Sequence, residues 1–153
     1  MINKFKDMVG IEGVKIKLEI PSEVKEKDGN IIGRVIFHSK RKQQITELRI
    51  RLLEKYSRGK GEQRLSDEYE LSKLYFDRPI NIEADDTMEL DFELPIKLVK
   101  SDMDEFEGRF LIGRLATAAK YFRSVKSEYR VEVEAKVKGI LLNPFTMQEI
   151  NIR

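Results

Sequence analysis

The sequence contains no cysteine, no tryptophan and a single histidine, His38. Without cysteine the chain forms no disulfide and no zinc–thiolate site, and both Cys–His nucleophilic pairs and multi-histidine metal sites are excluded. A Ser-His-Asp triad would need His38 itself, which we interpret as a surface or strand-edge residue at the end of a β-type run. We therefore expect no enzymatic activity, no cofactor and no metal ion.

Long hydrophobic runs are also missing. The longest runs, such as Phe110–Ile112, are far shorter than the ~20 residues of a membrane-spanning helix, and no apolar signal core is found near the N-terminus. These features predict a cytoplasmic protein. The 153 residues, of which 41% are hydrophobic, are enough for one domain with a sizeable core, so we expect a single domain over residues 1–153.

Carboxylates are plentiful, but their spacing is not that of a catalytic or metal site. Asp85-Asp86 is typical of a turn. The acidic run 102–107 could bind calcium through oxygen, yet it lacks the glycine and the spaced terminal glutamate of an EF-hand loop. We therefore favour a charged helix start at this run. A carboxylate-dependent hydrolase remains the enzymatic hypothesis, with no local motif in its favour.

The net charge of +2 conceals a segregation of charge along the chain. Residues 40–60 carry eight basic and two acidic residues, residues 66–107 carry four basic and fourteen acidic residues, and residues 109–126 carry five basic and no acidic residues. Either these segments pair with each other, across strands or between copies of the protein, or one of them forms an anion-binding face.

Alternation of apolar and polar residues at a period of two predicts β-strands over most of the chain. The Asp28-Gly29 and Asp85-Asp86 pairs predict turns between them. Short strands separated by turns are typical of an antiparallel sandwich or barrel rather than a βαβ fold. The predicted strands cover residues 14–20, 32–38, 45–56, 68–76, 79–82, 88–94, 129–137 and 149–152.

One predicted strand carries a ladder of basic residues on its outward face. Alternate residues of a strand lie about 6.6–6.8 Å apart, close to the spacing of phosphates along an extended nucleic-acid strand. No aromatic residues are interleaved with the ladder, which disfavours nucleic acid as a partner. Pairing with the acidic strands of residues 66–93 would neutralise it. The candidate anion- or partner-binding residues here and in the preceding turn are Lys40, Arg41, Lys42, Arg49, Arg51 and Lys55.

Residues 108–124 form the one segment with helical periodicity. Its apolar side is expected to pack on the open face of the sheet, although such a helix could also lie on an anionic membrane or bind a partner. The opposite side carries three further candidate binding residues, Arg109, Lys120 and Arg123.

Several motifs resemble those of the arrestin-like group, which includes arrestins, retromer cargo subunits and bacterial and archaeal sporulation-control-like proteins. They lie in the opening strand and in residues 27–35, 44–52, 90–95 and 127–136. The resemblance implies a mainly β protein, an arrestin-like (immunoglobulin-like) antiparallel β-sandwich to which the helix near 108–124 is added. It also implies a non-enzymatic role.

The leading functional hypothesis is an adaptor or regulatory scaffold that contacts unknown protein partners through exposed strand edges, as a homo-oligomer. The alternative is a peripheral protein that binds an anionic membrane surface, or another polyanion, through the basic ladder and the amphipathic helix.

Overall fold

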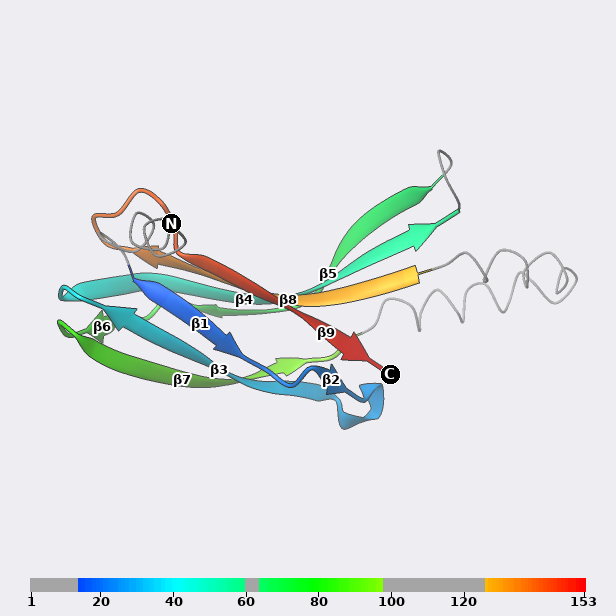
Figure 1. Cartoon of the computed structure of the whole chain (residues 1–153), viewed down its shortest axis with the longest axis horizontal. Coiled ribbons are helices and arrows are strands. Elements are labelled where there is room, and N and C mark those ends of the chain that lie inside the picture. Colours follow the sequence, from blue (N-terminus) through cyan, green and yellow to red (C-terminus); the bar gives the residue numbers. More distant parts are fainter. Residues whose placement is uncertain (1–13, 60–63, 98–125) are drawn as a thin grey trace, which may run out of the picture.

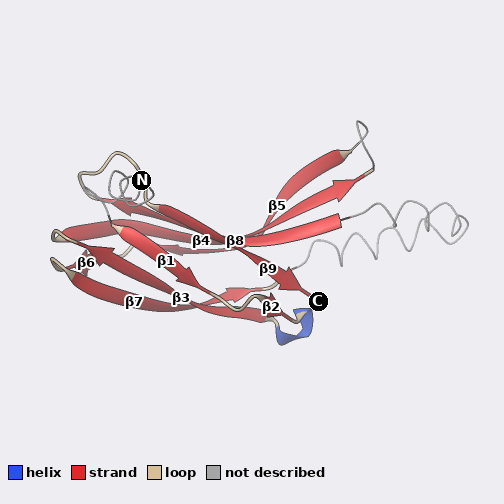
Figure 2. Ribbon diagram, viewed as in Figure 1, coloured by secondary structure: helices blue, strands red, loops and turns tan. Residues whose placement is uncertain are grey.

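The computed structural model describes residues 14–59, 64–97 and 126–153. Strands dominate this part of the chain, and a short 3-10 helix, η1, is found beside them (Figure 2). The elements are β1 Lys15–Glu19, β2 Glu23–Val24, η1 Glu26–Asp28, β3 Asn30–Ser39, β4 Gln43–Arg58, β5 Leu65–Phe76, β6 Ile80–Ile82, β7 Asp86–Pro95, β8 Lys126–Val137 and β9 Phe145–Ile152. The predicted strands are all present. The predicted helix 108–124, with Arg109, Lys120 and Arg123, lies outside the described residues.

The strands form two sheets that face each other (Figure 1). The smaller sheet has the order β1-β3-β7, and both of its pairings are antiparallel. The larger sheet has the order β2-β9-β8-β4-β5, with β6 pairing the start of β4. All of its pairings are antiparallel except the short one between β2 and β9. This architecture confirms the predicted mainly β, two-sheet fold.

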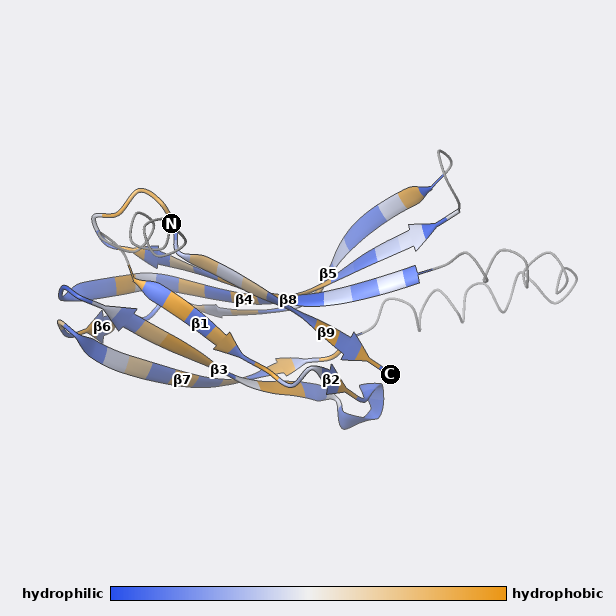
Figure 3. Ribbon diagram, in the orientation of Figure 1, coloured by the Kyte–Doolittle hydropathy of each residue, from blue (hydrophilic) through white to orange (hydrophobic). Residues whose placement is uncertain are grey.

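The core lies between the sheets because the apolar residues of each strand alternate toward it. Phe37 of β3, Leu94 of β7, Ile50 of β4 and Val133 of β8 are all fully buried. Burying side chains of this kind contributes roughly 1.5–3 kcal/mol each relative to leaving them exposed. The hydropathy colouring follows the same alternation along the strands (Figure 3).

Close packing and a tight turn fix the smaller sheet. Gly33 of β3 pairs with Phe92 of β7, and a Cβ at Gly33 would come within 2.5 Å of the Phe92 ring. The predicted reversal at Asp28-Gly29 is confirmed, and Gly29 takes a left-handed φ of 78° that glycine adopts without strain. The β6–β7 turn places Asp85 at a φ of 57°.

β4 is the longest strand and lies inside the larger sheet, between β8 and β5. Its 16 residues pair with β8 along one side and with β5 and β6 along the other. The register with β5 shifts between Leu52 and Leu53, whereas the register with β8 continues through these residues. The β4–β5 hairpin and the start of β8 extend beyond the smaller sheet (Figure 1).

Candidate functional site

The outward face of the larger sheet carries the predicted basic ladder. The continuous β4–β8 register places Arg49 opposite Glu134 and Arg51 opposite Glu132. Because successive strand residues point to opposite faces, these four side chains share the face that points away from the core. The basic residues of β4 therefore meet acidic residues of β8 directly across the sheet.

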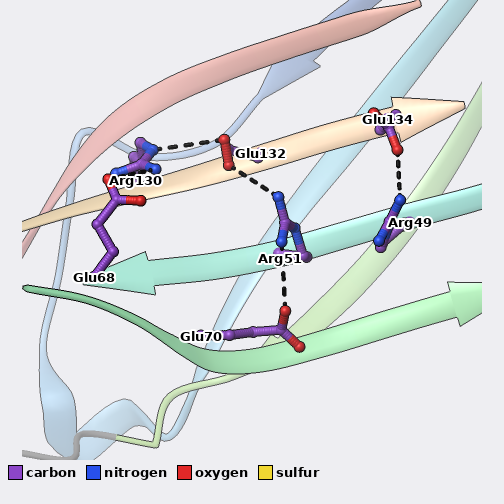
Figure 4. Close-up of polar contacts among 7 residues, drawn as sticks. All are labelled: Arg49, Arg51, Glu68, Glu70, Arg130, Glu132 and Glu134. Atoms are coloured by element: carbon purple, nitrogen blue, oxygen red, sulfur yellow. Dashed lines mark hydrogen bonds and ion pairs between the residues drawn. The ribbon is translucent and has the colours of Figure 1, made fainter. Parts of the chain in front are cut away.

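Ion pairs join these residues as one separate pair, Arg49 with Glu134, and one connected chain that runs Glu70–Arg51–Glu132–Arg130–Glu68 (Figure 4). Arg49 Nη2 lies 2.5 Å from Glu134 Oε1. Arg51 lies 3.4 Å from Glu132 and 3.5 Å from Glu70 of β5. We call this set the paired-charge ladder; its members are Arg49, Arg51, Glu68, Glu70, Arg130, Glu132 and Glu134.

Arg130 extends the chain of ion pairs across β4 to β5. From β8 it reaches over β4 to Glu68 of β5, at 3.0 Å, and also contacts Glu132 at 3.6 Å. Leu53 of β4 lies between Arg130 and Glu70 in register and is only 6% exposed although it is on the outward face. The aliphatic part of a long cationic side chain shields apolar surface in this way. The ladder thus covers a leucine as well as pairing charges.

This geometry favours charge pairing over an open anion-binding face at Arg49 and Arg51. Their carboxylate partners come mainly from β8, and only Glu70 lies in the acidic segment 66–93 that the sequence pointed to. Lys55 lies on the same face, opposite Glu68 and Glu128. The pKa of the Glu128 carboxyl is lowered first by its hydrogen bond to Lys126 and, to a smaller extent, by Lys55.

The remaining predicted basic residues lie apart from the ladder. Lys40, Arg41 and Lys42 form the connection between β3 and β4. The Lys42 ammonium is 4.0 Å from Glu83, and within the described residues Lys40 and Arg41 make no ion pair. The structure therefore separates the candidate set into a paired group on the sheet face and a less paired group at one end.

A buried acid lies on the inward face of the same part of the sheet. Glu54 of β4 is 1% exposed, and its Oε2 atom has no hydrogen-bond partner among the described residues. It pairs in register with Tyr129 of β8, whose hydroxyl hydrogen-bonds the Glu54 carboxylate. Burial first, and then the charge of Glu54, raise the pKa of Tyr129 well above its usual value. The alternation places Glu54 inside, although sequence reasoning did not single it out.

The described residues contain little that resembles a reaction centre. His38 lies on the outward face of β3, between Lys15 and Thr87 in register. Among these residues, no three His, Cys, Asp or Glu side chains are grouped to hold a metal ion. A hollow of about 370 Å³ beside the ladder has charged residues at six of its eight lining positions, whereas small-molecule pockets are predominantly apolar.

Sequence reasoning missed the β8 half of the ladder. The alternation of Glu132, Glu134 and Lys136 was visible in the sequence as the polar side of a predicted strand. Its complementarity to Glu47, Arg49 and Arg51 was the available signal, because like-spaced charges of opposite sign favour cross-strand pairing. The exposed apolar residues of the β8–β9 connection were missed as well.

Within the described residues, no helix is long and apolar enough to span a bilayer.

Comparison with known proteins identifies the family. The structure resembles the crystal structure of Spo0M, a sporulation control protein from Bacillus subtilis, with a TM-score of 0.62 and 12% sequence identity. The match covers 92% of this chain and 49% of that one, so the chain spans about half the length of this relative, and the likeness concerns the fold.

The sequence comparisons point to the same group. Among curated proteins no sequence matches the chain. The family model described as SpoOM protein matches residues 2–100, which is more than half of the sequence. This match confirms the resemblance to the sporulation-control-like members of the arrestin-like group, and the chain belongs to the Spo0M family.

Proposed function

We propose that the protein is a non-enzymatic cytoplasmic adaptor that binds an extended segment of a partner protein along the free edge of β5. The observation that carries the proposal is the position of β5, a 12-residue strand at the end of the larger sheet as formed by the described residues. Its backbone groups on the side away from β4 can accept an added strand. The solved relative from Bacillus subtilis is a sporulation control protein, and an adaptor is one form that such a regulatory role takes.

The charge of this edge favours a particular partner. Asp67, Glu68 and Glu70 are all exposed on the first half of β5. Glu68 and Glu70 are paired with Arg130 and Arg51, whereas Asp67 makes no ion pair among the described residues. A basic extended segment would be attracted to this edge, whereas a second copy of β5 would bring like charges together. Homo-oligomerisation, if it occurs, therefore needs another surface.

The test is capture of partners from cell lysate at moderate salt, read by mass spectrometry, with two variants of equal charge change. Asp67→Lys alters the β5 edge, and Asp28→Lys alters the exposed η1 helix. Partners retained by the wild type and by Asp28→Lys but lost by Asp67→Lys would support the proposal. Partners that both variants retain would overturn the assignment to β5.

Membrane binding through the basic ladder is the alternative function. Arg49 and Arg51 each have a carboxylate within 3.5 Å. The ladder therefore has less unpaired positive charge than the basic residues of β4 alone predict. The helical residues of this alternative lie outside the described part of the chain. The adaptor therefore has the stronger support of the two.

A further inference from the structure

The connection between β8 and β9, residues 138–144, exposes large apolar side chains at one end of the molecule. Leu141 is 100% exposed and Leu142 is 83% exposed. Phe145 and Met147, which are about half exposed, continue the apolar surface along the outward face of β9. Figure 3 shows this connection as a hydrophobic segment at the end where the β3–β4 and β6–β7 turns also lie.

The connection is held by backbone hydrogen bonds. Lys138 N–H donates to Gln44 C=O at 2.9 Å, Ile140 N–H donates to Val137 C=O at 3.2 Å, and Ala135 N–H donates to Pro144 C=O at 3.0 Å. Ile140 packs against the core, whereas the next two residues project from it. A fixed backbone thus presents two leucines to solvent, and exposed contiguous apolar surface marks an interaction site.

Two lysines that make no ion pair among the described residues precede the leucines in the chain. Lys136 and Lys138 lie at the end of β8 and just beyond it, and neither makes an ion pair within the described residues. The hydrogen bond from Lys138 to Gln44 ties the connection to the start of β4, directly after the Lys40–Lys42 turn. Two carboxylates on the outward face lie close by in register and have other partners. Glu47, opposite Lys136, is hydrogen-bonded by the Tyr75 hydroxyl, and Glu134, opposite Phe145, is bound by Arg49.

Apart from Glu47 on β4 itself, the acidic residues that the structure describes at this end lie on the other side of β4. The β6–β7 turn carries Glu83 and Asp85, and β6 pairs with the side of β4 that is opposite β8. Glu83 is the residue that contacts Lys42. The surface formed by the β8–β9 connection is therefore both apolar and basic.

We propose that this surface docks on an anionic lipid bilayer, with Leu141 and Leu142 inserted among the headgroups and Lys136 and Lys138 bound to the anionic lipids. Peripheral anchors combine these two contributions, and their apolar groups enter about 5–10 Å into the interface. A projecting loop tip suits insertion. Two copies joined by this surface would bring their lysines together, so charge disfavours a second copy as the occupant.

This membrane surface and the proposed β5 edge lie at opposite ends of β4. The β8–β9 connection is tied to Gln44, whereas the first half of β5 pairs with residues 53–58. At about 3.3 Å per residue the two ends of β4 are about 45 Å apart. A membrane-bound molecule would leave the β5 edge accessible, and either proposal stands if the other fails.

The absence of tryptophan allows a direct test. Leu142→Trp places a single fluorophore at the proposed insertion point, and Leu65→Trp places one at an exposed position of β5, at the far end of β4. With vesicles of phosphatidylcholine and phosphatidylserine, the emission of Leu142→Trp should shift to the blue and be quenched by brominated lipid. The emission of Leu65→Trp should not change. No shift for Leu142→Trp, or equal shifts for both, would overturn the proposal.

Vesicle sedimentation then tests the two contributions. Leu141→Ser with Leu142→Ser should weaken binding by about tenfold or more, and Lys136→Glu with Lys138→Glu should weaken it by a similar factor. Lys25→Glu with Lys27→Glu at η1 is the charge-matched control and should retain binding. Binding should fall with salt and be weak on pure phosphatidylcholine. A leucine variant that changes the solution mass of the protein but not vesicle binding would overturn the membrane assignment in favour of self-association.

Discussion

The paired-charge ladder and the β8–β9 connection place similar residue types in opposite situations. In the ladder, each arginine has a carboxylate within 3.6 Å, and an outward-facing leucine is 6% exposed. At the connection, Lys138 and the adjacent Lys136 of β8 have no ion pair among the described residues, and Leu141 and Leu142 are almost fully exposed. The composition of a segment therefore does not show whether its charges and apolar groups are available to a partner. That depends on which strand lies beside it.

The largest effect on stability is expected from Leu53→Ala. The ion pair between Arg130 and Glu68 leaves Leu53 only 6% exposed, as in a protein core. Truncating the Leu53 side chain should therefore lower the free energy of unfolding by about 3 kcal/mol. Leu65→Ala, at a residue that is 57% exposed, should lower it by less than about 0.5 kcal/mol. Urea unfolding followed by circular dichroism measures both, and equal effects would show that the ladder does not shield Leu53.

The next largest effect is expected in the pH dependence of stability, through Tyr129 on the inward face of the larger sheet. Tyr129 has a raised pKa in the folded protein because it is buried beside Glu54, so the folded state keeps this proton where the unfolded state loses it. Stability should therefore fall as the pH rises above about 10. Tyr129→Phe should reduce the slope of unfolding free energy against pH in this range. An unchanged slope would contradict the burial of the phenol beside the acid.

A smaller effect is expected from exchanging a pair of the ladder. Arg49→Glu and Glu134→Arg, made singly, should each destabilise the protein by about 1 kcal/mol, since like charges would face each other across the strands. Both side chains are more than a third exposed, so solvent screens the pair. Made together, the two changes should restore most of the loss. A double variant no more stable than the single ones would mean that the pairing is not energetically coupled.

The smallest effect on stability is expected at the β8–β9 connection. Leu141→Ser with Leu142→Ser should leave the urea midpoint within the equivalent of about 0.5 kcal/mol, because exposed side chains lose no packing. The same variant is expected to lose vesicle binding, so the two measurements separate a binding role from a folding role. A large loss of stability would show that these leucines belong to the core.

The strands were predictable because their signal is local. The alternation at 14–20 and 129–137 and the Asp28-Gly29 turn depend on neighbouring residues only, and the structure confirms them. Even Gly33 lies in a run whose neighbours predicted a strand, although the approach of Phe92 could not be foreseen.

The environment of individual side chains was harder to predict because it depends on lateral neighbours. Glu134 meets Arg49 across 85 residues of sequence, and no local pattern specifies that register. The burial of Leu53 and of Glu54, on opposite faces of β4, follows from the same distant pairing. Leu141 and Leu142 were passed over because a short apolar pair in a turn predicts no periodic element.

The position of β4 between β8 and β5 also has a consequence during synthesis. Its β8 partner residues are translated about 85 residues later, which at about 5–20 residues per second is roughly 4–17 s. Over this interval the apolar alternation of β4 has no final neighbour on that side. Arg49 and Arg51 are the charged half of this alternation, and charges placed beside hydrophobic strand residues in this way oppose pairing of unfinished strands with one another.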